Sequence, residues 1–134
     1  SRFDFMEYFA AKDKAVKSKI IVQVFNFCDL LSLKRENPFG GIHFSGLSGI
    51  GTNRFLRPML IKSLRACGVL SVSISDWEIS EEGVNDMVKE FRENGFVVSV
   101  AGVNTLSYYR RLRKLGVNCI DTDFLTPKAL EEVQ

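Results

Sequence analysis

The sequence predicts an α/β fold in which short parallel strands alternate with amphipathic helices. Gly68, Gly95 and Gly116 each end one segment and open a short apolar run rich in β-branched residues. Between these runs, apolar residues recur at helical spacing, and such alternation is typical of a parallel sheet with right-handed crossovers. Five strands allow two architectures. One is part of an eight-stranded (β/α)8 barrel of TIM type, holding strands four to eight with their helices; the other is a flavodoxin-like doubly wound sheet.

The predicted strands are five apolar runs. "KIIVQVF" and "GIHFS" supply the first two, and the others follow the three glycines, which favour the left-handed conformation that ends a helix. The runs are short and β-branched, as expected of strands buried on both faces. We expect parallel strands at 20–25, 41–45, 69–74, 97–101 and 117–121, each paired with its sequence neighbour if the sheet is wound as a barrel.

Helices are predicted in the intervals. Ser80 caps one helix, and Glu81 and Glu82 occupy its first turn, where carboxylates favour the positive end of the helix dipole. Thr126 caps the last helix, with Pro127 at its first position. Apolar stripes at 84, 87, 88 and 91, and at 106, 109 and 112, indicate helices that face a sheet. Further helices are expected at 4–16, 29–36 and 54–67.

Composition describes an ordinary globular chain of 134 residues, 46% hydrophobic and 25% charged. The net charge of +2 gives no support for nucleic-acid binding, and the apolar runs are too short to span a membrane. Cys28, Cys67 and Cys119 are too far apart for a zinc site, so we expect buried, reduced thiols and a cytoplasmic or other reducing compartment. From the length we expect residues 1–134 to form a single domain, or the C-terminal part of a larger barrel domain if the opening Ser, in place of Met, marks an excerpt.

Two motifs carry a family resemblance. Ala101-Gly102-Val103-Asn104 is followed, after a basic helix, by "LGVNCIDTD" at 115–123. This pair resembles the C-terminal W-T-V-N and L-G-V-D-G-I-I-T-D motifs of the glycerophosphodiester phosphodiesterases, which are phospholipase-C-like barrels. "IIVQVFNFCDLLSLKRENP" and "SISDWEISEEGVNDMVKEFRENG" are similar to earlier segments of the same family. The resemblance begins at the fourth barrel strand.

The resemblance implies a hydrolase that acts on a glycerophosphodiester or lysophospholipid with a divalent metal, Ca²⁺ or Mg²⁺, in the complete domain. Ala101 replaces the tryptophan of the first motif, and no H-R-G, E-N-T or E-x-D segment occurs. We therefore expect no catalytic residue, metal ligand or activity in this chain alone. Two rival functions stay open: a non-catalytic binding or assembly module, and a doubly wound domain that binds a small anion.

Asn104, Asp123 and Trp77 are the candidate substrate contacts, since each is expected at the barrel mouth, where such active sites are built. Each also has a structural explanation, which we favour. Asn104 can cap the helix near 105, Asp123 can bond loop amides, and Trp77 can cover apolar surface. Asp121 and Asp123 would share one face if both were in the strand.

Three further features have mainly structural interpretations. His43 has no catalytic partner at a recognisable spacing, so a structural histidine is expected. "RRLRK" at 110–114 fits a solvated face near the negative end of a helix better than a phosphate or lipid contact. "SGLSGIGTN" at 45–53 lacks the P-loop ending and fits a flexible loop, although phosphate at the next helix N-terminus is physically reasonable.

The last expectation concerns assembly. Five consecutive strands cannot close a barrel at eight-strand curvature, so two apolar sheet edges would face water. Neither "KIIVQVF" nor "VNCID" carries enough charge or proline to protect such an edge. We expect self-association of the isolated chain, or pairing with the missing N-terminal strands.

Overall fold

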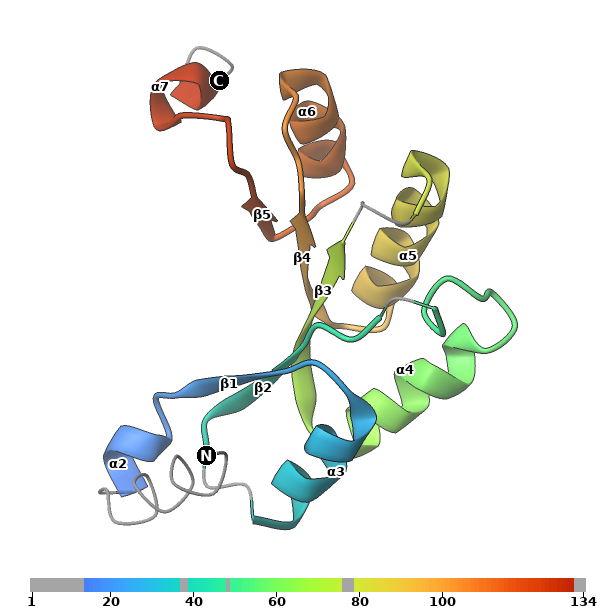
Figure 1. The fold of residues 1–134 in the computed structure, drawn as a ribbon, viewed down its shortest axis with the longest axis vertical. Coiled ribbons are helices and arrows are strands. Elements are labelled where there is room, and N and C mark those ends of the chain that lie inside the picture. The colour runs from blue at the N-terminus through green and yellow to red at the C-terminus, as the bar shows by residue number, and fades with distance from the viewer. Residues whose placement is uncertain (1–13, 37–38, 48, 76–78, 132–134) are drawn as a thin grey trace.

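The computed structural model describes residues 14–36, 39–47, 49–75 and 79–131, which form a five-stranded sheet backed by helices (Figure 1). Its strands are β1 (Ile21–Val24), β2 (Gly41–Phe44), β3 (Val69–Ser75), β4 (Val97–Ala101) and β5 (Cys119–Asp121). Neighbours in the sheet are parallel, in the order β1-β2-β3-β4-β5. This confirms the strand positions and the barrel winding. The doubly wound alternative is wrong, because such a sheet reverses its strand order at a switch point.

The helices are α2 (Lys14–Lys17), α3 (Phe27–Glu36), α4 (Arg57–Ala66), α5 (Glu81–Glu93), α6 (Leu106–Lys114) and α7 (Pro127–Glu131). Figure 1 shows α3, α4, α5 and α6 on one side of the sheet, and among the described residues no further long helix covers the other side. The helix predicted at 29–36 begins at Phe27, because Asn26 Oδ1 accepts the Asp29 amide at 2.9 Å. Most of the helix predicted at 4–16 lies outside the described residues. Each described helix is too short or too polar to cross a bilayer.

Helix ends follow the chemistry that the sequence predicted. Ser80 caps α5 by accepting the Gly83 amide at 3.2 Å. Gly68, Gly95 and Gly116, after α4, α5 and α6, have φ values of +77°, +81° and +83°. An L-residue with a side chain rarely adopts this conformation, so glycine lets the chain turn directly into the next strand.

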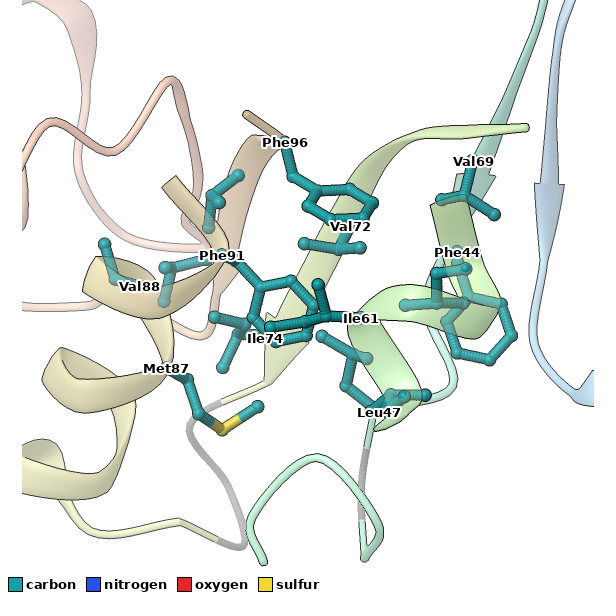
Figure 2. Packing of buried hydrophobic residues seen from close by; sticks show 14 of the residues in the cluster. Phe44, Leu47, Ile61, Val69, Val72, Ile74, Met87, Val88, Phe91 and Phe96 are labelled. Carbon is teal, nitrogen blue, oxygen red and sulfur yellow. The ribbon is translucent and has the colours of Figure 1, made fainter. Parts of the chain in front are cut away.

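The core lies between the sheet and the helices. Val24, Phe44, Val72 and Val98 are paired in register across β1 to β4 and are all buried. Figure 2 shows how Ile61 of α4 and the apolar stripe of α5, Met87, Val88 and Phe91, pack toward Val72 and Ile74 of β3. Burying one such side chain contributes about 1.5–3 kcal/mol. This outer face therefore holds the fold together.

The opposite face of the sheet has a different character. Alternate residues on a strand point to opposite faces, so this inner face carries the register row Gln23, His43, Ser71 and Val97. Ile21, Leu70 and Val97 are exposed near the N-terminal ends of their strands. The expectation of strands buried on both faces holds at the centres of β3 and β4, where residues 72–74 and 98–100 are all buried, but not at these exposed N-terminal ends.

Candidate functional site

The candidate site begins where β4 and β5 end. Val103 N donates to Asp121 O at 3.2 Å, which ties the segment after β4 to the last residue of β5. Asn104 Oδ1 then accepts the Asp123 amide at 3.2 Å and the Thr122 hydroxyl at 3.4 Å. Asn104 and Asp123, predicted as mouth residues, are thus brought together in an exposed position at the C-terminal ends of adjacent strands.

The local bonds correct two structural interpretations of these residues. Thr105, not Asn104, caps α6, since Thr105 Oγ1 accepts the Tyr108 amide at 3.4 Å. Thr122, not the Asp123 carboxylate, holds the turn after β5: its Oγ1 accepts the amides of Phe124 at 3.3 Å and Leu125 at 3.1 Å. The backbone amide of Asp123 thus has a structural role, while the residue itself is exposed at the rim.

Other site predictions have different outcomes. Asp121 and Asp123 do not share a strand face, because β5 ends at Asp121. Trp77 lies outside the described residues. Cys67 is buried as expected, whereas Cys28 and Cys119 are exposed free thiols. Cys119 Sγ lies 4.0 Å from Asp121 Oδ1, a weak contact on the edge strand.

His43 lies below this rim on the inner face of β2. Its Nδ1 is 2.8 Å from Ser71 Oγ on β3, so the neighbouring strand supplies a hydrogen-bond partner. Burial lowers the pKa of His43 below its ordinary value of 6.5, and the Asp121 carboxylate partly offsets this shift by favouring the imidazolium. The electrostatic effect of Asp121 on His43 links β2 with β5 through the inner face. Sequence spacing alone could not find this group, since its members come from three different strands.

The inner face continues as a polar surface beside His43. Gln23 pairs with His43 in register, and its Nε2 donates to Ser45 Oγ at 2.8 Å, just after β2. Ser99 Oγ donates to the Val72 carbonyl at 3.4 Å. The alternating serines of "VLSVSIS" were a usable signal for this surface, because every second residue of a strand faces the same side. The polar side chains of this face thus bond to their neighbours on the sheet.

The described polar residues of the rim do not form a binding site for a divalent cation among themselves. Ca²⁺ and Mg²⁺ require several oxygen ligands around one point. Among the residues that the structure describes, no three His, Cys, Asp or Glu side chains gather in this way. Asp121, Asp123 and the Asn104 amide therefore do not by themselves fit the metal centre that the family resemblance implies.

In the described parts of the glycine-rich segment, 45–47 and 49–53, the contacts are structural. Asn53 Oδ1 accepts the amides of Phe55 at 2.9 Å and Leu56 at 3.4 Å, so the groups that would bind phosphate already have a partner. A Cβ on Gly46 would lie 2.2 Å from Phe25 O, and one on Gly51 would lie 2.5 Å from Leu47 O. These two glycines permit close backbone packing.

The basic run in α6 is also partly used by the fold. Arg111 pairs with Glu81 at the start of α5 and lies over the Tyr108 ring at 4.9 Å from its centroid. Arg113 donates to the Val117 carbonyl at 3.3 Å. Two of the basic side chains thus join α6 to its surroundings, in agreement with the structural interpretation of "RRLRK".

Comparison with known proteins identifies the family. A solved structure from Galdieria sulphuraria, assigned as a glycerophosphodiester phosphodiesterase, is similar with a TM-score of 0.62 and 17% sequence identity. The match covers 87% of this chain and 44% of that one, so this chain spans less than half the length of its solved relative. No curated protein matches. The model of the glycerophosphoryl diester phosphodiesterase family matches residues 2–126, nearly the whole sequence. The chain therefore belongs to the glycerophosphoryl diester phosphodiesterase family.

Proposed function

We propose that this chain forms the C-terminal wall of a phosphodiesterase barrel and supplies the substrate-facing rim, but not the catalytic centre. The observation that carries the proposal is the bond between Asn104 Oδ1 and the Asp123 amide at the mouth end of adjacent strands. Side chains there border the end of the sheet where barrel enzymes bind substrates. The Asn104 amide and the Asp123 carboxylate are suited to bind hydroxyl groups of a glycerol phosphodiester.

The catalytic centre is proposed to belong to other strands. Family members generally depend on a divalent metal, which would stabilise phosphoryl charge during hydrolysis. His43 is the only histidine of the sequence, and its Nδ1 is already bonded to Ser71. A metal-assisted hydrolase needs acid–base groups and a set of cation ligands. The single imidazole and the described rim residues do not supply both.

The first test is hydrolysis by the purified chain. Glycerophosphocholine and a lysophospholipid are incubated with the chain in Ca²⁺, Mg²⁺ or EDTA, and release of the alcohol is followed. We expect no turnover above the protein-free rate in any of these conditions. Metal-dependent turnover that copurifies with the chain through successive columns would contradict the proposal.

The second test restores the missing strands. The chain is coexpressed with the first three β/α units of a family relative, and the assembled pair is assayed. Asp123→Asn keeps the backbone amide that bonds Asn104, so it tests the carboxylate alone. We expect KM to rise roughly tenfold, as for loss of one or two hydrogen bonds to a substrate. Ser107→Ala, on the exposed face of α6, is the control and should leave KM unchanged.

An assembly module without activity is the second candidate, and the exposed apolar side chains Ile21, Leu70 and Val97 on the inner face favour it. The two candidates differ in the coexpression experiment. A stable but inactive pair, with the catalytic residues of the relative intact, would support the assembly role and would count against the rim role of Asn104 and Asp123.

A further inference from the structure

The loop between β2 and α4 exposes large apolar side chains on a fixed backbone. Phe55 is 95% exposed and Met59 is 64% exposed, and Leu56 and Ile50 are exposed beside them in the sequence. Arg57 N donates to Asn53 O at 3.0 Å, so the helical turn already starts at Asn53. Phe55 and Met59 are four residues apart and therefore lie on the same face of that turn. We call Ile50, Phe55, Leu56 and Met59 the α4 patch.

Hydrogen bonds of the buried Arg57 and of Asn53 hold the backbone of the α4 patch. Arg57 is 2% exposed, and its Nε donates to Gly51 O at 2.8 Å while its Nη1 bonds Glu90 Oε2 of α5, also at 2.8 Å. Asn53 caps the same turn through Phe55 and Leu56. These bonds tie the described segment 51–57 to itself and to α5, while Phe55, Leu56 and Met59 remain exposed. Leaving a phenylalanine in water loses about 1.5–3 kcal/mol that burial would supply, so a fixed, exposed Phe55 indicates a surface that is covered in use.

The position of the α4 patch excludes the missing strands as its cover. The loop packs against α5 through Arg57 and Glu90, and Figure 1 shows it beyond the helices, on the side of the sheet opposite to the uncovered face. Strands added at the edges of the sheet would close over the inner face, on the other side of the sheet from the α4 patch, so they would not by themselves cover it.

Charge around the patch indicates the occupant. From 39 to 75 the sequence has no Asp or Glu, whereas it has Arg54, Arg57, Lys62 and Arg65. Arg54 and Lys62 flank the α4 patch in exposed positions, and the Asp86 carboxylate reaches Arg54 only at 3.9 Å. Phenylalanine, leucine and methionine flanked by basic side chains are typical of surfaces that bind anionic lipid interfaces.

We propose that the α4 patch is a lipid-surface docking site that inserts Phe55 and Met59 among acyl chains while Arg54 and Lys62 contact anionic head groups. The loop follows β2, so it belongs to the same C-terminal end of the sheet as Asn104 and Asp123. Docking would thus hold the mouth end of the fold near a membrane surface. Docking through the α4 patch does not depend on hydrolysis by this chain.

The test is sedimentation of the full chain with vesicles of phosphatidylcholine, with and without phosphatidylglycerol. The wild-type chain is expected to bind the anionic vesicles and to be released by high salt. Phe55→Ser with Met59→Ser should weaken binding at least about tenfold, as expected from the apolar area withdrawn. Leu31→Ser is the matched control, since Leu31 is an exposed apolar residue on α3 outside the patch, and it should bind like wild type.

The charge arm uses Arg54→Glu with Lys62→Glu, which should abolish the preference for anionic vesicles. Folding of every variant is checked by circular dichroism, and its oligomeric state by light scattering without lipid. No binding by the wild-type chain, or equal binding by the Phe55 and Met59 variant, would overturn the proposal. A patch variant that dissociates an oligomer in the absence of lipid would also overturn it, because the α4 patch would then be a protein interface.

Discussion

At the residue scale, His43 shows how the sheet sets the chemistry of one side chain. Its ring lies between two opposing influences, since burial favours the neutral imidazole and the Asp121 carboxylate favours the imidazolium. Burial is the larger influence, so the ring is neutral over more of the physiological range than in a free peptide. The neutral ring still forms the hydrogen bond with Ser71 Oγ. If Nδ1 carries the proton it donates to the hydroxyl oxygen, and if Nε2 carries the proton Nδ1 accepts from the hydroxyl.

Replacing Asp121 by Asn should lower the pKa of His43 further, because the carboxylate that favours the imidazolium is removed. Since His43 is the only histidine, its ring protons can be followed without assignment in an NMR pH titration. Asp123→Asn is the control and should shift the midpoint less. An unchanged or higher midpoint in the Asp121 variant would show that the carboxylate does not act on this ring.

The same shift predicts how stability depends on pH. The folded pKa of His43 lies below its unfolded value near 6.5, so the unfolded chain binds the proton more readily. This contribution to the free energy of unfolding is complete above pH 6.5 and is lost as pH falls from there through the folded pKa. Urea midpoints of wild type and His43→Gln, measured across that interval, should show a weaker acid dependence in the variant.

Asn104 offers a second prediction at this scale. Asn104→Ala removes the acceptor for the Asp123 amide and the Thr122 hydroxyl, so it should lower the free energy of unfolding by about 1 kcal/mol. Hydrogen exchange at the Asp123 amide should accelerate as well. Asn104→Asp keeps an acceptor and should retain most of the protection. Equal exchange in all three proteins would mean that this bond does not hold the rim.

At the element scale, the loop before α4 shows what holds the helical layer together. The buried Arg57 guanidinium donates hydrogen bonds to Gly51 O at 2.8 Å, to Thr52 O at 3.4 Å and to Glu90 Oε2 at 2.8 Å. Because Glu90 belongs to α5, one side chain connects a βα loop to the next helix. Arg57 is buried while the Glu90 side chain is 31% exposed, so removing the arginine leaves the buried carbonyl contacts at Gly51 and Thr52 without a donor and the half-buried carboxylate without its partner.

Arg57→Met should therefore destabilise the chain strongly, by about 3 kcal/mol, in urea denaturation followed by circular dichroism. Arg54→Met is the matched control three residues away. Its side chain is exposed and its Asp86 contact is long, so the change should stay within about 0.5 kcal/mol. A similar decrease in the free energy of unfolding in the two variants would mean that the buried Arg57 stabilises the fold no more than an exposed arginine does.

Local sequence signals located the strands, but they did not reveal contacts between distant segments. Glycines after helices and β-branched runs located all five strands, because those signals are local. The start of α3 was missed because it depends on the Asn26 side chain, and the N-cap of α6 was one residue later than expected. The His43–Ser71 pair and the Arg57 cluster join segments that are distant in sequence, so no local pattern could reveal them.

At the scale of the whole molecule, the uncovered face of the sheet is the main consequence of the fold. Ile21 and Leu70 flank Gly41 on that face: a Cβ placed on Gly41 would lie 3.7 Å from Ile21 Cγ1 and 3.0 Å from Leu70 Cδ1. Both side chains are exposed, so they form an apolar strip across β1, β2 and β3. In a closed barrel, strands from the remainder of the wall would cover such a strip.

The isolated chain should therefore self-associate through this face and through the unpaired edge of β1. Light scattering should give a mass that rises with protein concentration. Ile21→Lys with Leu70→Lys should shift the chain toward monomer, because a buried lysine without a partner disfavours association. Leu31→Lys, on α3, is the control and should leave the mass unchanged.

Added β/α units from a family relative should compete with self-association, since both would use the same face. A wild-type chain that stays monomeric at high concentration and unfolds in one sharp transition would show that the inner face is stable in water, and the proposal of a barrel wall would then lose its physical basis.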